Sequence, residues 1–326
     1  MPLRHVLSIV QVGVSTLLVA VLVYWMRAQQ GDLFDRFWET PKAWPWLGAG
    51  FLAALVAVLC TFLRWYLLVV ALGVDFTLGD ALRLGFLGYF CNFFAVSSVG
   101  GDVFKAVLVA RENPGRRVEV VASIAVDRIV GLYGLLLFFI AVYWSTDTVF
   151  TRVGTVRAIA DTVLMLAAGA TISGGAVLLG AGGLARRWDR RGEANFAATV
   201  VLRLFHALRL YRYRPLVLVM AVLLSVIVHG SLSASFYFSA RGLAAPHPDF
   251  AAHCVLVPLA MLVGSLPLTL NGIGALEGAV EYLYSICPPS PQPIPAGQGL
   301  LVCLAYRLFT VATALLGAWY YIGARR

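Results

Sequence analysis

Long apolar runs constrain this chain more than any other feature. Six of them are candidates for membrane spans: 5–26, 48–72, 119–144, 157–183, 215–240 and 299–322. A helix of about 20 residues crosses a hydrocarbon core of about 30 Å, and a helix satisfies its backbone hydrogen bonds internally, as lipid requires. The composition agrees, because 60% of the 326 residues are hydrophobic and 13% are charged. We therefore predict an all-α, polytopic membrane protein.

Two further apolar stretches, 80–111 and 253–285, are interrupted by glycine, proline and charge. The first contains "SSVGGD" and the second contains "PLTLNGIG". Glycine and proline mark turns, and the predicted turn residues are Gly100, Gly101, Pro267, Gly272 and Gly274. Each stretch is either a further full span or a re-entrant helical hairpin, which leaves the membrane on the side from which it entered.

The basic residues favour the hairpins. Lys and Arg accumulate in cytoplasmic loops, and the segment 184–214 alone carries eight arginines. If 80–111 crossed completely, both this segment and the basic loop 112–118 would lie outside. Two opposed re-entrant hairpins keep every basic loop inside. We therefore predict six spans, two opposed hairpins, and N- and C-termini in the cytoplasm.

The order of these elements indicates an inverted repeat within a single membrane domain, 1–326. Span, span, hairpin and span occur in the half 1–150 and again, in the opposite orientation, in the half 151–326. A basic amphipathic segment at 184–214 joins the halves on the cytoplasmic side. The repeat matches Lys105 with Glu277 after the turns, and Arg128 with Arg307 in the spans that follow. In transporters, interrupted segments at matching positions of two halves mark the substrate site.

Charged residues within the apolar segments are the candidate site. A charge at the centre of a bilayer costs about 2.5–3.5 kcal/mol, so we expect these residues to pair around one polar cavity. Arginine grips phosphate with two parallel hydrogen bonds, and lysine acts as a point charge. The predicted substrate-binding cations are Arg64, Lys105, Arg128 and Arg307. The predicted charge-balancing or proton-coupling carboxylates are Asp102, Asp127 and Glu277.

Several of these residues have purely structural alternatives. Arg64 lies close enough to a span end to reach the membrane surface, and Asp102 and Glu277 follow turns, where a carboxylate caps a helix. His229 and His253 are expected to form hydrogen bonds within apolar surroundings rather than to relay protons. The five scattered cysteines show no disulfide or zinc spacing, so we predict no metal and no cofactor.

The chain resembles the lysylphosphatidylglycerol synthase transmembrane region family of bacterial and archaeal membrane proteins. The motifs that carry the resemblance are "LRW" at Leu63, "GYFCNFF" at Gly88, "GGDVFKA" at Gly100, "SIAVDRIVGL" at Ser123, "LPLTLNGIGALEG" at Leu266 and "YRL" at Tyr306. The resemblance implies a flippase-like protein of a prokaryotic cytoplasmic membrane. Because no cytoplasmic loop is long enough for a soluble synthase domain, we expect the stand-alone form.

The leading hypothesis is therefore a flippase or scramblase for an anionic, phosphate-bearing lipid, either a phospholipid or a polyprenyl-linked lipid. The expected partners are membrane lipids and no nucleic acid. No "GxxxxGK[ST]" phosphate loop occurs, which argues against direct ATP hydrolysis. One alternative is an intramembrane lipid-phosphate enzyme that uses Asp102 or Asp127 as base or nucleophile. Another is an accessory subunit that presents lipid to a separate synthase or glycosyltransferase.

Overall fold

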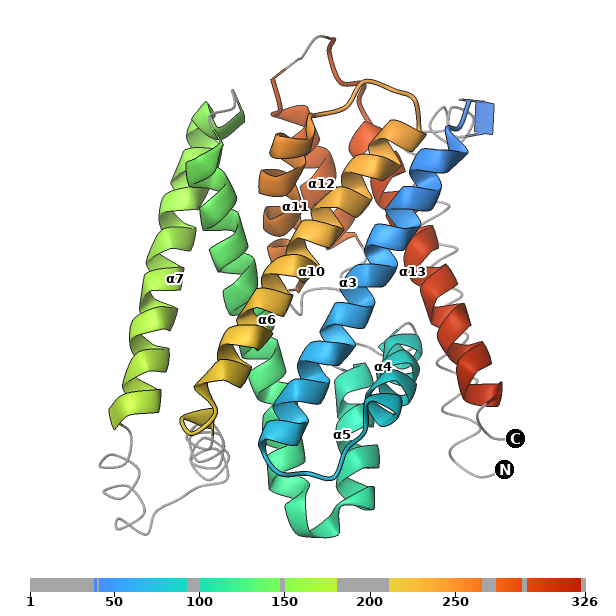
Figure 1. Cartoon of the computed structure of the whole chain (residues 1–326). Helices are drawn as coiled ribbons and strands as arrows, with labels where there is room; N and C mark the ends of the chain where they lie inside the picture. The colour runs from blue at the N-terminus through green and yellow to red at the C-terminus, as the bar shows by residue number, and fades with distance from the viewer. Residues whose placement is uncertain are drawn as a thin grey trace.

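The computed structural model describes residues 38–39, 41–92, 100–146, 150–180, 211–265, 274–288 and 292–323. The regular secondary structure of these residues is entirely helical (Figure 1). The long helices are α3 (Trp44–Ala71), α6 (Arg117–Ser145), α7 (Gly154–Gly180), α10 (Pro215–Gly242) and α13 (Gln298–Gly323). The short helices are α4 (Leu78–Asn92), α5 (Gly100–Glu112), α11 (Phe250–Ser265) and α12 (Ala275–Ser285), and two 3₁₀ turns precede α6 and α7.

Each of the five long helices contains a stretch that is long and apolar enough to cross a membrane. They confirm five of the six predicted spans, and the sixth, 5–26, lies outside the described residues. The protein is therefore a multi-pass helical membrane protein.

Small residues bring α3 and α10 together along much of their length. Ala54, Ala57, Ser235 and Ser239 are buried, and a side chain on Gly50 would lie only 3.2 Å from the carbonyl oxygen of Ser235. Small residues allow such close approach in membranes, where burial from water does not drive helices together. A backbone bond from the amide of Ala43 to the carbonyl of Gly242, 2.9 Å long, closes the upper end of this pair as drawn in Figure 1.

The first interrupted stretch forms the helix pair α4 and α5 at the lower end of the molecule (Figure 1). The guanidinium Nη1 of Arg116, after α5, donates a 2.8 Å hydrogen bond to the carbonyl of Leu72, before α4. The chain therefore leaves this pair next to the point where it enters. Helices of 15 and 13 residues are about 20 Å long, shorter than the hydrocarbon core.

The second interrupted stretch forms α11 and α12 at the opposite, upper end (Figure 1). Nε2 of His253, near the start of α11, lies 2.7 Å from the hydroxyl of Tyr284, near the end of α12. This contact holds the two outer ends of the pair together. Both interrupted stretches thus fold back on themselves, in opposed directions, while their insertion into the bilayer stays a prediction.

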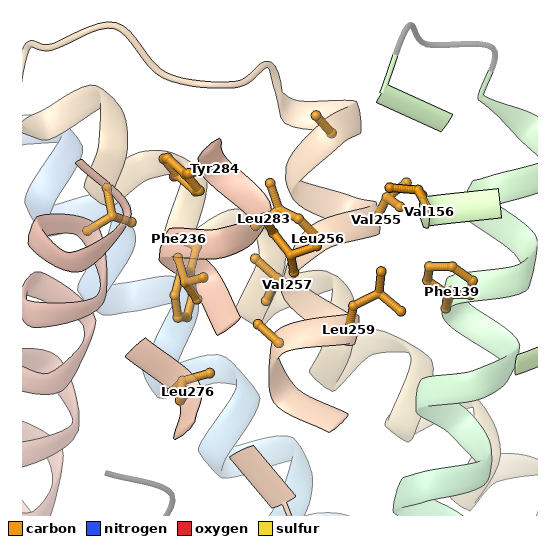
Figure 2. Packing of buried hydrophobic residues seen from close by; sticks show 14 of the residues in the cluster. Phe139, Val156, Phe236, Val255, Leu256, Val257, Leu259, Leu276, Leu283 and Tyr284 are labelled. Carbon is orange, nitrogen blue, oxygen red and sulfur yellow. The ribbon is translucent and has the colours of Figure 1, made fainter. Parts of the chain in front are cut away.

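Buried apolar side chains form an upper and a lower core. The upper core joins α7 and the α11–α12 pair to α6, α10 and α13, and Figure 2 shows Phe139, Phe236 and Leu256 within it. The lower core joins α4 and α5 to α3, α6 and α10 around Trp65 and Leu68. Each interrupted pair is therefore packed within protein, which non-helical backbone at membrane depth requires.

The described helices repeat one order. A long helix, two short helices and a long helix occur as α3 to α6 and again as α10 to α13, running in opposite directions (Figure 1). The division into halves 1–150 and 151–326 stays a prediction, because most of the joining segment 184–214 lies outside the described residues.

A glycine contact at the α4–α5 crossing gives a stability test. A Cβ on Gly101 would lie 2.1 Å from the carbonyl oxygen of Gly88, so we expect Gly101→Ala to lower stability by about 1–3 kcal/mol through overpacking. In α7, a Cβ placed on Gly174 meets no atom of the described residues within 4 Å. Gly174→Ala should therefore gain up to about 1 kcal/mol from helix propensity. Unfolding in detergent would compare the variants, and equal effects would contradict the crossing.

Candidate functional site

Arg64 is a deeply buried charged residue of the predicted site. Its Nε and Nη2 donate to the two carboxylate oxygens of Asp127 at 2.7 and 3.0 Å, and its Nη1 donates to the Ser225 hydroxyl at 2.8 Å. The side chains of Arg64 and Asp127 are 6% and 10% exposed. The bidentate ion pair satisfies both charges and joins α3 to α6, and the Ser225 contact joins them to α10. Arg64 thus lies within the bundle and not at a span end.

Asp102 lies in the first turn of α5 and holds two cations. The Lys105 ammonium is 2.7 Å from one carboxylate oxygen, and the Arg128 guanidinium of α6 contacts the other. The Lys105 nitrogen also lies 5.0 Å from the ring centre of Trp65, within the range of a cation–π interaction. Trp65 follows Arg64, and Arg128 follows Asp127, so the two groups are neighbours. We call these five charged residues the lower charge network: Arg64, Asp102, Lys105, Asp127 and Arg128.

In the lower charge network, two cations share one carboxylate, because Asp102 pairs with both Lys105 and Arg128. The side chain of Arg128 is 52% exposed, whereas those of Lys105 and Asp102 are 13% and 6% exposed. Arg128 lies in the candidate span Glu119–Ser145, roughly 17 Å along α6 from its first residue. An accessible cation at this depth favours an anionic ligand.

Glu277 and Arg307 form a second ion pair, which we call the upper pair. Nε of Arg307, in α13, donates to Oε1 of Glu277 at 2.7 Å. Oε2 of Glu277 accepts the amide of Gly274 at 2.8 Å, which caps α12. Gly274 has a φ of 86°, a left-handed conformation that glycine adopts without strain. Glu277 therefore combines the capping role with the charge-balancing one.

The two groups correspond in the repeated helix order. Asp102 is the third residue of α5 and Glu277 the third residue of α12, and each pairs with an arginine of the next long helix. The sequence analysis matched Lys105 with Glu277 by their distance from the two turns. In the structure, Asp102 is the residue that corresponds to Glu277, and Lys105 forms an ion pair with Asp102. Helix α4 packs against both α5 and α13, so it lies between the two groups. The convergence of all seven residues on one cavity stays a prediction.

Three of the five predicted turn residues lie in the described part of the chain. Gly100 and Gly101 begin α5, and the amide of Gly101 donates a 2.8 Å hydrogen bond to the Asn92 side chain of α4. Gly274 precedes α12 directly. Pro267 and Gly272 lie outside the described residues.

Three further polar contacts support the helices of the site. Two of them, at Ser225 and at Arg241, were not predicted, and the third involves Glu281, a charged candidate of the stretch 253–285. Ser225 is a single hydroxyl in an apolar run, and it completes the Arg64 site. Glu281 accepts the amides of Gly297 and Leu300, so it caps α13 from α12. Near the upper end, the Arg241 guanidinium lies 3.9 Å from the ring centre of Trp46.

The histidines and cysteines occupy structural surroundings. His229 contacts the carbonyl of Gly131, and His253 contacts the carbonyl of Asp249 and the hydroxyl of Tyr284. All five cysteines are free thiols, and burial raises the pKa of the Cys287 thiol, between α12 and α13, to about 11. A protonated thiol is a weak nucleophile. Within the part of the chain that is described, no three His, Cys, Asp or Glu residues gather as metal ligands.

The sequence matches the family model described as "Lysylphosphatidylglycerol synthase TM region" over residues 8–317, nearly the whole chain. No curated protein and no solved structure matches it.

The Arg64–Asp127 pair gives a direct test of this geometry. Asp127→Asn should lower the free energy of unfolding by about 3–5 kcal/mol, because it leaves a buried guanidinium without its counter-charge. The double change Arg64→Met with Asp127→Leu should recover most of that loss, since apolar residues of similar size replace buried pairs well.

The matched control is Asp161→Asn, on the exposed surface of α7, which should change stability by less than about 0.5 kcal/mol. Thermal unfolding of the detergent-solubilised protein would measure all three. If Asp127→Asn behaved like Asp161→Asn, the buried pair would not hold the three helices together.

Proposed function

Since this chain belongs to the lysylphosphatidylglycerol synthase transmembrane region family, we propose that it moves an anionic, phosphate-bearing lipid across the membrane as a flippase or scramblase. The observation that carries the proposal is the half-exposed guanidinium of Arg128 within a candidate membrane span, held beside Lys105 by the shared carboxylate of Asp102. A lipid phosphate would contact both cations.

The shared pairing of Asp102 with Lys105 and Arg128 supports reversible phosphate binding. Asp102 holds Arg128 and Lys105 in place before a ligand arrives. A phosphate that contacts the same two cations adds charge-assisted hydrogen bonds, of which arginine forms two in parallel. Because Asp102 remains beside them, its negative charge weakens the hold on phosphate, and transport requires release as well as binding.

The upper pair, Glu277 and Arg307, would provide a second phosphate-binding step for lipid transport. Glu277 and Arg307 belong to the helix pair and span that run opposite to α5 and α6 (Figure 1). We propose that Arg307 receives the phosphate after Arg128, while Glu277 balances charge or carries a proton when Arg307 turns to the lipid. Opposed half-membrane elements around a central site are the arrangement of alternating-access transporters.

The orientation follows from the basic residues. Arg116 lies between α5 and α6 at the lower end and Arg117 begins α6. Arg212 and Arg214 lie just before α10 begins at the same end (Figure 1). Because positive charge concentrates on the cytoplasmic side, we propose that the lower end faces the cytoplasm of a prokaryote. The lower charge network then serves the inner leaflet.

A proteoliposome assay tests the proposal. Fluorescent phosphatidylglycerol should change leaflet faster in vesicles that contain the protein than in empty vesicles. Arg128→Gln should slow the protein-dependent rate at least about tenfold, because a hydrogen bond to a charged group contributes about 1.5–3 kcal/mol. Arg128→Lys should retain part of the rate, since it keeps the charge and loses the two-pronged geometry.

The control is Arg241→Gln, which removes an exposed arginine that stacks on Trp46 at the upper end and should leave the rate unchanged. Wild-type flipping by Arg128→Gln would sink the proposed site. A new covalent lipid product would favour the enzyme alternative, and transport that appears only with a co-purified synthase would favour the accessory subunit.

A further inference from the structure

An exposed arginine at the upper end of α10 is held by aromatic rings and by no carboxylate. Arg241 lies in the last turn of α10, and its guanidinium carbon is 3.9 Å from the ring centre of Trp46 and 5.9 Å from that of Tyr237. Within the described part of the chain, this guanidinium forms no hydrogen bond and no ion pair. Asp249, in the loop that follows α10, instead accepts the amide of Ala252.

The aromatic contacts position this guanidinium in advance of any ligand. Trp46 of α3 stacks on Phe238 of α10, with ring centres 5.6 Å apart. A ring against the face of a guanidinium leaves the N–H donors at its edge available to an anion. A side chain that is already ordered loses little further freedom when it binds. We call these four residues the arginine platform: Trp46, Tyr237, Phe238 and Arg241.

The length of α10 places Arg241 at the level of lipid headgroups. Arg214 directly precedes α10 and Arg241 directly precedes its last residue, so the two arginines are roughly 40 Å apart along the helix. A bilayer with its headgroups is about 40–45 Å thick, and its hydrocarbon core is about 30 Å thick. Trp44, which is 71% exposed, lies at the same end, because the neighbouring Ala43 bonds to Gly242. Tryptophan is enriched at headgroup level.

The face of α10 below Arg241 is apolar and exposed. Leu223 and Ile227 share this face by helical spacing, and they are 57% and 48% exposed. Both lie in the candidate span Pro215–Gly242. The stretch from Ile227 to Arg241 is roughly 21 Å long, which exceeds one hydrocarbon leaflet of about 15 Å. Arg241 therefore ends a lipid-facing surface at the depth where acyl chains meet phosphates.

We propose that the arginine platform binds the phosphate of a resident anionic phospholipid in the leaflet at the upper end. The guanidinium donates two parallel hydrogen bonds to the phosphate, and an acyl chain lies along Leu223 and Ile227. Lys42, next to Ala43, adds a second cation at this end. With the lower end in the cytoplasm, as proposed above, a bound anion accounts for positive charge on the opposite side. The platform is separate from the lower charge network and the upper pair.

Photocrosslinking tests the platform without requiring transport. Benzoylphenylalanine replaces Trp44, beside the platform, or Trp144, the matched control. Trp144 is 69% exposed in the last turn of α6 and contacts no cation among the described residues. Each variant is placed in vesicles of equal phosphatidylglycerol and phosphatidylcholine and irradiated. We expect position 44 to form about fivefold more adduct with phosphatidylglycerol, and position 144 to show no preference.

Substitution of Arg241 identifies the group responsible. In the protein labelled at position 44, Arg241→Gln should abolish the preference, and Arg241→Lys should keep part of it, because lysine retains the charge and loses the parallel donors. Equal ratios at positions 44 and 144 would overturn the proposal, as would an unchanged ratio after Arg241→Gln. An adduct to residues 5–26 or to a second copy of the chain, in place of lipid, would also overturn it, because protein would then cover the platform.

The crosslinking and transport results can fail separately. Arg241→Gln should lose the preference for phosphatidylglycerol and still flip lipid at the wild-type rate, since the resident lipid is not the transported one. A preference at position 44 in a protein that flips no lipid would support the platform and refute the transport function. Flipping without that preference would refute the platform and keep the function.

Discussion

The buried contact of Arg64 with Asp127 and Ser225 is the constraint on which the rest of the bundle depends. A guanidinium inside an apolar bundle is stable only if its charge and its donors are satisfied. The partners come from α6 and α10, so α3 must lie beside both. Gly131 and Gly134 of α6 leave room there, since a side chain on either would meet Arg64 or Ser225. This junction also sets Trp65 beside Lys105.

The same residues that hold helices together prepare the site for a ligand. Asp127 is fully engaged by Arg64, so it does not neutralise its neighbour Arg128. Arg128 instead shares Asp102 with Lys105. In the upper pair, the carboxylate of Glu277 meets Arg307. The two groups therefore repeat one geometry, a carboxylate in the first turn of a short helix paired with an arginine of the next long helix.

Much of the architecture was predictable because lipid permits few solutions. Apolar length identified five described spans, and glycine with positive-inside bias identified two chain reversals. The motif residues Asp102, Glu277 and Arg307 were recognisable as charges that need partners. Their pairing was not predictable in full. Lys105 was matched with Glu277 by its distance from a turn, but a lysine three residues after Asp102 on one helix reaches back to that carboxylate.

Sequence alone thus established a helical membrane protein, its opposed interrupted segments and the charged residues of its candidate site, because hydropathy and the cost of buried charge act residue by residue. Three-dimensional contacts decided which charges pair with one another, that Arg64 is buried while Arg128 is half exposed, and where α6 parts from α7 (Figure 1). Those outcomes depend on side chains far apart in the chain, such as Arg64 and Ser225. Leu135 is buried and Leu132 is exposed, although both lie on one face of α6. This difference depends on which helix packs beside each residue, and the periodicity of α6 alone does not contain that information.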